Sequence, residues 1–131
     1  MIKMYTDAAT KGNPGPTGLG ILILHSGQQL QLTGHLTRAS NHEGEFAAAQ
    51  QGFTYLVQHG LNSEPILFYT DSRLLSDAIG KTYSKHYQAQ LQALLSVMNQ
   101  TGTVVTQWIP EKKNHGAHHL ANQALHRLEK M

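Results

Sequence analysis

The segment that most constrains the fold of this chain is residues 65–71, which is apolar almost throughout and ends in Asp71. A continuous apolar run of this length is typical of a central strand that is buried on both faces of a sheet. Apolar residues at helical spacing precede it and end at Gly60, and a short helix is predicted directly after it over residues 72–79. The pattern therefore favours an α/β fold in which helices cover the sheet.

Three strands are predicted before the first helix. Residues 1–8 alternate in the manner of a strand, and residues 19–25 and 28–36 indicate two more strands joined by a tight turn at Ser26-Gly27. Ser40 and Glu43 have the spacing of a capping box, so the first long helix is expected to begin there.

The rest of the chain adds helices and one more strand. The first helix is expected to run to about residue 59, others over 84–99 and from the end of loop 111–116 through 130, with a strand over 103–109. The predicted order is β-β-β-α-β-α-α-β-α. We expect an α/β fold with a five-stranded mixed sheet flanked by helices, in a single domain of residues 1–131, with Phe46, Phe53 and Trp108 in the core.

Composition excludes several classes of protein. The 131 residues contain no cysteine, so disulfides and thiolate metal sites are excluded. No segment is long enough to cross a membrane, and a strand pattern at residue 1 leaves no room for a signal peptide, so a cytoplasmic protein is expected. With a net charge of +2 and 14% charged residues, the chain does not grip nucleic acid by charge alone.

A turn rich in Gly, Pro and Asn follows Asp7 and runs over residues 12–16. Asp7 would project from the rim of the sheet, and the glycines would let backbone amides approach a phosphate or a sugar closely. An ordinary hairpin turn with an exposed Asp is the alternative interpretation.

Two further acids favour a functional site. Glu45 lies in the first turn of the first long helix, and Asp71 ends the central strand. If the strands that carry Asp7 and Asp71 are neighbours, the three carboxylates converge and would repel one another unless divalent cations lie among them. Oxygen ligands favour Mg²⁺ or Mn²⁺, and two such ions about 3.5–4 Å apart promote in-line displacement at a phosphodiester.

An ordered set of motifs resembles type 1 ribonuclease H, and its last part is similar to the compact prokaryotic ribonuclease HI-like branch. The resemblance covers essentially the whole chain and is carried by Thr6-Asp7, Gly12-Asn13-Pro14-Gly15-Pro16, Gly18-x-Gly20, Ser40-Asn41-x-x-x-Glu45, Tyr69-Thr70-Asp71-Ser72 and Asn114-x-x-Ala117-x-x-Leu120-Ala121-Asn122-x-Ala124.

The resemblance implies cleavage of the RNA strand of an RNA–DNA hybrid, leaving 5′-phosphate and 3′-hydroxyl ends. It implies that Asp7 bridges two metal ions, that Glu45 and Asp71 complete the inner set of ligands, and that Glu45 touches the ribose 2′-hydroxyl.

The same resemblance implies a set of substrate contacts. Backbone groups near Lys11, Gly12 and Asn41 would contact the RNA minor groove, where 2′-hydroxyls distinguish RNA from DNA. A phosphate of the DNA strand would be held by Asn13, Arg38 and Ser40. The alternatives are a solvated loop charge for Arg38 and a turn-forming role for Asn13.

One position departs from the family pattern. A fourth carboxylate usually occurs early in the last helix, but this chain has Ala117-His118 there. Neutral imidazole is a competent ligand for Mn²⁺ and a poorer one for Mg²⁺, so His118 is predicted to bind metal with a preference for Mn²⁺. The alternative is a surface or packing histidine in a degenerate enzyme.

Neighbouring residues offer other roles. His115 is the candidate for the proton-shuttling role that the family gives to a loop histidine. A zinc site formed with His119 is a competing interpretation, and Glu111 is either a substitute acid or a solvated loop residue.

Larger family members insert a basic, aromatic-rich helix and loop where this chain has only residues 80–86, with two lysines. We therefore expect that this chain binds hybrid weakly and in a salt-sensitive way, or that it relies on a protein partner. We also expect a monomer. Two alternatives to hydrolysis of hybrid remain open. One is a weakened module that binds hybrid or structured RNA without efficient cleavage, and the other is a related nuclease acting on single strands.

Overall fold

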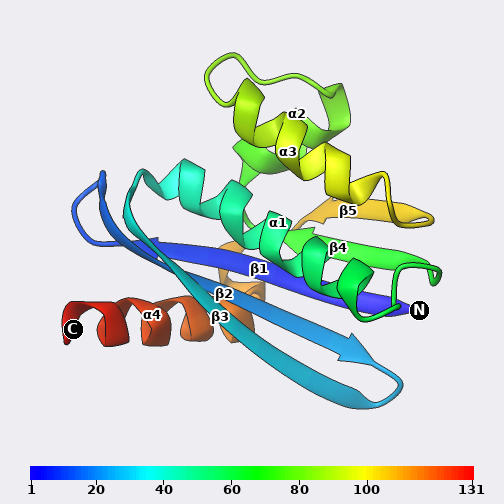
Figure 1. The fold of residues 1–131 in the computed structure, drawn as a ribbon, viewed down its shortest axis with the longest axis horizontal. Coiled ribbons are helices and arrows are strands. Elements are labelled where there is room, and N and C mark those ends of the chain that lie inside the picture. The colour runs from blue at the N-terminus through cyan, green and yellow to red at the C-terminus, as the bar shows by residue number, and fades with distance from the viewer.

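A five-stranded sheet with strand order β3-β2-β1-β4-β5 forms the centre of the structure, a computed structural model that describes residues 1–131 (Figure 1). The elements are β1 (Ile2–Thr10), β2 (Gly15–His25), β3 (Gln28–Ala39), α1 (Asn41–Gln58), β4 (Ile66–Thr70), α2 (Arg73–Lys81), α3 (Gln88–Met98), β5 (Val104–Trp108), the 3₁₀ turn η1 (Glu111–Lys113) and α4 (His115–Glu129). Apart from η1, this is the predicted order, and the predicted fold class is confirmed.

The sheet is mixed and covered on both sides. Strands β1, β2 and β3 are antiparallel, whereas β1–β4 and β4–β5 are parallel pairs. Figure 1 shows α1, α2 and α3 on one side of the sheet and α4 alone on the other. None of the helices combines the length and hydrophobicity needed to cross a bilayer.

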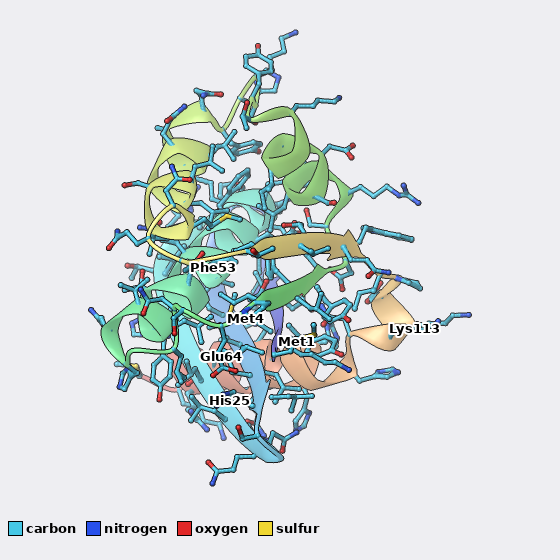
Figure 2. All side chains as sticks on the ribbon, turned by 90° about the vertical axis from the view of Figure 1, so that its right-hand side faces the viewer. Met1, Met4, His25, Phe53, Glu64 and Lys113 are labelled. Atoms are coloured by element: carbon cyan, nitrogen blue, oxygen red, sulfur yellow. The ribbon has the colours of Figure 1, made fainter.

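The main core lies between α1 and the sheet. Phe53 of α1 and Phe68 of β4 are fully buried, and their rings meet edge to face with centroids 5.2 Å apart. Met4 of β1 is also fully buried and lies near Phe53 (Figure 2). Each such side chain contributes roughly 1.5–3 kcal/mol by leaving water. This packing fixes α1 against β1 and β4, the strands that carry the predicted acids.

The opposite face of the sheet approaches α4 at two glycines of β2. A Cβ atom at Gly18 would lie 2.2 Å from the carbonyl oxygen of Ala121, and one at Gly20 would lie 2.2 Å from that of Ala117. Only glycine allows this close approach between strand and helix. The Gly18-x-Gly20 motif therefore sets the position of α4 and of the residues at its start.

Several element boundaries differ from those predicted. Strand β1 continues past its predicted end at residue 8 to Thr10, because its pairing with β2 extends to the pair Thr10–Thr17. Helix α2 runs through Gly80 to Lys81 and ends where Thr82 adopts the left-handed conformation, with φ of 53°. Helix α3 begins at Gln88 rather than Ser84, because the Ser84 hydroxyl accepts a hydrogen bond from the Tyr87 amide and forms a turn before the helix.

Candidate active site

The ends of two parallel strands place Asp7 and Asp71 side by side. The β1–β4 ladder pairs Thr6 with Thr70 as its last residues, so Asp7 and Asp71 each follow directly at the same edge. Asp7 is 7% exposed, and its Oδ1 accepts a hydrogen bond from the Ala8 amide at 2.9 Å. The sequence-based condition that these two strands are neighbours is met.

Helix α1 supplies the third acid, Glu45. Its first turn is fixed by the predicted capping box, in which the Ser40 hydroxyl accepts from the Glu43 amide and the Glu43 carboxylate accepts from the Ser40 amide. Glu45 is 9% exposed, and its Oε1 accepts from Asn41 Nδ2 at 2.8 Å. Its Oε2 is buried without a hydrogen-bond partner, which is costly for a carboxylate unless another group satisfies it.

The three predicted acids line one cavity of about 240 Å³. Its complete lining is Asp7, Ala8, Asn41, Glu45, Asp71, Glu111 and His118. The predicted metal-ligand set is therefore together in space, and Glu111 joins it from the segment after β5.

His118 faces Asp7 from the start of α4. Its Nδ1 lies 2.9 Å from Asp7 Oδ2, and its Nε2 lies 3.1 Å from the side-chain Nδ2 of Asn122. Asn122 Nδ2 also contacts the His118 carbonyl oxygen at 3.0 Å. In the tautomer that carries its proton on Nδ1, His118 donates to Asp7 and accepts from Asn122.

Burial and mutual repulsion make the acids weaker than usual. Burial, followed by the nearby charge of Asp71, raises the pKa of Asp7 to about 6. Burial also raises the pKa of Glu45 to about 7, with the charges of Asp7 and Asp71 adding to it. The pKa of Asp71 is raised by burial and by the neighbouring charge of Glu111. The cavity therefore favours added positive charge.

The donor chemistry of the cavity fits divalent cations that prefer oxygen. Three carboxylates face one space, one buried carboxylate oxygen lacks a partner, and the pKa values of all three acids are raised. No three acidic or histidine side chains are positioned as a ready-made ligand set, so binding would draw the carboxylates inward. Asp7, Glu45 and Asp71 are the residues that would hold the ions.

His115 lies beside this cavity rather than in it. It begins α4 and lines an adjoining open cavity of about 530 Å³ with Pro110, Glu111, Lys112 and His118. Glu111 and His118 line both spaces. His115 is exposed, which places it at the solvent side of the candidate site.

Of the predicted substrate residues, only Asn41 lines the carboxylate cavity. Its backbone amide donates to Asn13 Oδ1 at 2.8 Å, so Asn13 links the glycine-rich turn to the start of α1. Gly12 is exposed in that turn, and its φ of 70° is in the left-handed region that favours glycine. The turn and the helix start therefore form one continuous rim beside the acids.

The other predicted substrate residues lie further out. The Lys11 amide donates to the Pro16 carbonyl oxygen and its Nζ pairs with Glu129 at 3.0 Å, so both groups already have partners. Ser40 caps α1 through the hydrogen bonds described above. Arg38 is exposed near the end of β3.

Two residues that support the site were not predicted as functional. Asn114 is 1% exposed, and its Nδ2 donates to the Thr6 carbonyl oxygen at 2.9 Å, next to Asp7. Trp108, predicted to be a core residue, is only half-buried, with Arg73 packed 3.9 Å from its ring centroid. Its Nε1 donates to the Asp71 carbonyl oxygen at 3.0 Å. No sequence pattern around Trp108 or Asn114 indicates these contacts, because each one joins distant parts of the chain.

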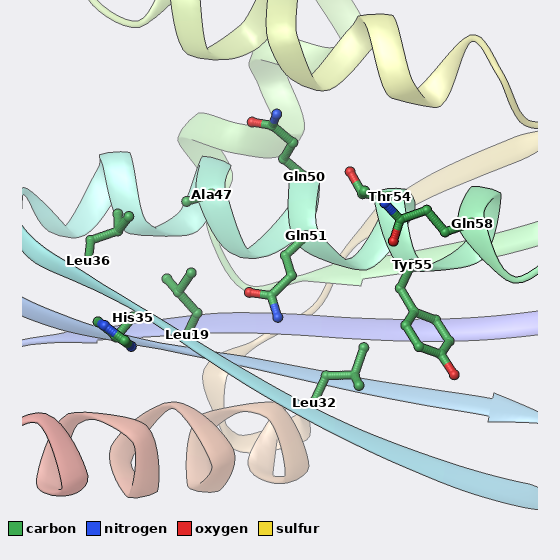
Figure 3. A pocket seen from close by; sticks show the side chains of 10 residues that line it. All are labelled: Leu19, Leu32, His35, Leu36, Ala47, Gln50, Gln51, Thr54, Tyr55 and Gln58. Atoms are coloured by element: carbon green, nitrogen blue, oxygen red, sulfur yellow. The ribbon is translucent and has the colours of Figure 1, made fainter.

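A separate cavity of about 470 Å³ lies between α1 and β3, away from the acids (Figure 3). Apolar side chains such as Leu19, Leu32 and Ala47 line part of it, and Gln51 Nε2 donates to the Thr33 carbonyl oxygen at 3.1 Å. It contains none of the predicted site residues.

A family model described as reverse transcriptase-like matches residues 5–124. The chain belongs to this family. The putative hydrolase EbsB of Enterococcus faecalis is a relative that is 35% identical over 98% of the chain and 96% of its own length. Ribonuclease H of Trichodesmium erythraeum is 35% identical over 67% of the chain. The chain spans 54% of that relative's length, and about half of several others with the same name.

Solved structures show the same fold. LC11-RNase H1 in complex with an RNA/DNA hybrid superposes with a TM-score of 0.87 at 24% identity, covering 97% of this chain and 98% of that one. The chain therefore has a ribonuclease H-like fold.

Proposed function

We propose that this protein is a metal-dependent endoribonuclease that hydrolyses the RNA strand of RNA–DNA hybrids. The convergence of Asp7, Glu45 and Asp71 on one cavity is the observation that carries this proposal. The buried Oε2 of Glu45 adds to it, because it has no hydrogen-bond partner and its nearest cationic neighbour, His42 Nδ1, is 3.9 Å away. The proposed enzyme is a single ribonuclease H-like domain of residues 1–131 from the compact HI-like branch of type 1 enzymes. Relatives named ribonuclease H and the hybrid complex of LC11-RNase H1 support the choice of substrate.

The proposed cofactor is a pair of Mg²⁺ or Mn²⁺ ions. Asp7 would be a ligand of these ions, because its buried carboxylate lines the cavity together with Asp71 and His118. Glu45 and Asp71 would complete the carboxylate ligands, and His118 is the proposed fourth ligand. When bound, such ions activate water and stabilise the leaving oxygen at a phosphodiester.

The protein residues have separate tasks in the proposed reaction. The water oxygen gives up a proton and bonds to phosphorus as the bond from phosphorus to the 3′ oxygen breaks. The 3′ oxygen takes up a proton, which leaves 5′-phosphate and 3′-hydroxyl ends. His115, exposed beside the acids, would carry a proton between its imidazole and solvent. The turn that contains Gly12 and the start of α1 at Asn41 would contact the RNA strand, while Asn13, Arg38 and Ser40 would hold a DNA phosphate.

The test is cleavage of an RNA strand that is labelled and annealed to DNA, with Mg²⁺ and Mn²⁺ supplied separately. Asp7→Asn is the control for contaminating nucleases, and single-stranded RNA and double-stranded RNA are the control substrates. We expect cutting of the hybrid alone, lost in Asp7→Asn. Hybrid binding by the folded protein without cutting in either metal would contradict the proposal and indicate a binding module.

A further inference from the structure

The segment from Ile109 to Asn114 is anchored at both ends to the strands that carry the acids. The Ile109 amide donates to the Thr70 carbonyl oxygen at 2.9 Å, immediately before Asp71. Asn114 Nδ2 donates to the Thr6 carbonyl oxygen at 2.9 Å, immediately before Asp7. The segment therefore crosses the edge of the sheet where β1 and β4 present their carboxylates.

Glu111 lies in the middle of this anchored segment. Pro110 precedes it, η1 begins at it, and its carbonyl oxygen accepts from the Asn114 amide at 2.9 Å. Because its backbone is held in this way, its side chain lines the same cavity as Asp7, Glu45 and Asp71. Glu111 thus combines a fixed backbone with a carboxylate beside the other three.

Glu111 is exposed at the solvent side of the cavity, with Asp71 lining the same space. It forms no ion pair with the two lysines that follow it in η1. Its charge instead acts on Asp71, whose pKa it helps to raise. A bound divalent cation would turn this repulsion into attraction.

His118, which lines the same cavity, is less free than Glu111. Both of its ring nitrogens have protein partners, Asp7 at Nδ1 and Asn122 at Nε2. Glu111 has no hydrogen-bond partner for its carboxylate among the side chains around it. A cation would therefore meet the Glu111 carboxylate without breaking a side-chain contact, whereas His118 would first have to exchange one of its two contacts.

We propose that Glu111 is a fourth carboxylate ligand of the divalent-cation site formed by Asp7, Glu45 and Asp71. This role depends on the proposed function, because the site is the same one. Glu111 would then be the second acid that comes from outside the sheet, after Glu45 of α1. It is supplied by the loop after β5 and not by α4.

Direct binding of Mn²⁺ tests the proposal without relying on activity. Binding is measured by electron paramagnetic resonance, as the decrease in the signal of unbound Mn²⁺. The variants are Glu111→Gln, Glu111→Asp and Asp7→Asn. Asp77→Asn is the matched control, because Asp77 is an exposed acid on α2 outside the carboxylate cavity. We expect Glu111→Gln to weaken Mn²⁺ binding by about tenfold. Glu111→Asp should lose less, and Asp77→Asn should stay within about twofold of the wild type.

Thermal unfolding without metal distinguishes a ligand from a structural residue. Glu111→Gln should unfold at the wild-type temperature or slightly above it, because it relieves repulsion on Asp71. Mn²⁺ affinity of Glu111→Gln equal to that of the wild type would overturn the role of Glu111, as would absence of Mn²⁺ binding by the wild type. Glu111-dependent Mn²⁺ binding in a protein that does not cut hybrid would support this role and contradict the proposed function instead.

Discussion

The imidazole of His118 and the carboxylate of Asp7 are in direct contact, with Nδ1 2.9 Å from Oδ2. Asp7 is buried and surrounded by other acids, so a neutral or cationic neighbour lowers the charge density at the centre of the site. A carboxylate at position 118 would add repulsion there unless metal ions were bound. This contact joins α4 to β1 at the point where chemistry is proposed to occur.

The first prediction concerns metal preference. If His118 binds metal, activity with Mn²⁺ should exceed activity with Mg²⁺, because imidazole is a poor partner for Mg²⁺. Activity with Mn²⁺ should also fall towards acidic pH, because a protonated imidazole has no lone pair to offer a metal ion. His118→Asp should shift the preference towards Mg²⁺. Cleavage rates of the hybrid with each metal from pH 5.5 to 8 provide the measurement.

Two outcomes would count against a ligand role for His118. One is a flat pH profile over that range with Mn²⁺, and the other is an unchanged metal preference in His118→Asp. His119→Asp is the matched control, because His119 is exposed on the same helix and bonds only Gln123.

The second prediction concerns stability without metal and uses Glu45→Gln. The pKa of Glu45 is raised from 4.5 to about 7 by burial, so the folded state retains its proton where the unfolded state has lost it. The stability that this proton confers is complete below about pH 4.5 and is lost as pH rises through 7. The loss amounts to a few kcal/mol for the wild type and is absent in Glu45→Gln. The variant's melting temperature relative to the wild type should therefore rise by roughly 5–10 °C between pH 5 and pH 8.

Scanning calorimetry of both proteins in a metal chelator, at several pH values, measures this difference. The amide of Glu45→Gln has its own effect on stability at the Oε2 position, which lacks a hydrogen-bond partner, but this effect is the same at every pH. It therefore cancels when the melting-temperature difference between variant and wild type is compared across pH values. Mn²⁺ added at pH 8 should raise the melting temperature of the wild type more than that of the variant. A difference in melting temperature that does not change with pH would show that Glu45 is ionised without cost.

The sequence was sufficient to predict the order of elements and the three acids, for identifiable physical reasons. The apolar run ending at Asp71 required a central strand, and the Ser40–Glu43 capping box placed Glu45 one turn into a helix. Once β1 and β4 are parallel neighbours, the ends of their ladder bring Asp7 and Asp71 together. These are local signals whose consequences follow from sheet geometry.

The supporting contacts could not be predicted, because they depend on side-chain directions between distant segments. Asn114 reaches Thr6 across 108 residues, and the Trp108 indole reaches the Asp71 backbone across 37. Nor could the sequence decide between the two roles considered for Glu111, since only the anchored loop places it on the cavity. The partners of Lys11 were missed for the same reason, because the pair with Glu129 depends on how α4 lies against the turn.

The third prediction concerns the contact between β2 and α4. Gly20→Ala places a Cβ atom 2.2 Å from the Ala117 carbonyl oxygen and 2.5 Å from the Ala121 amide nitrogen, so the helix must move. We expect destabilisation of about 3 kcal/mol in urea unfolding, together with loss of activity because α4 carries His118. Gly80→Ala is the control, since nothing lies within 4 Å of its added Cβ, and it should be neutral or stabilising by up to about 1 kcal/mol. Equal stability of the two variants would show that α4 adjusts freely.

The last prediction concerns substrate grip. The net charge is only +2, and the two lysines in this region are Lys81, the last residue of α2, and Lys85 in the short connection to α3. Few phosphates can then be neutralised, so the dissociation constant for hybrid should be large at 150 mM salt, and the remaining affinity should fall further as salt is raised. The double change of Lys81 and Lys85 to Ala should reduce the slope of log affinity against log salt by at most about 2, if both contact phosphates. Fluorescence anisotropy with Asp7→Asn, which is expected not to cut, measures these slopes. Tight binding that is insensitive to salt would contradict the prediction, whereas weak binding that a second protein strengthens would identify the partner that the enzyme relies on.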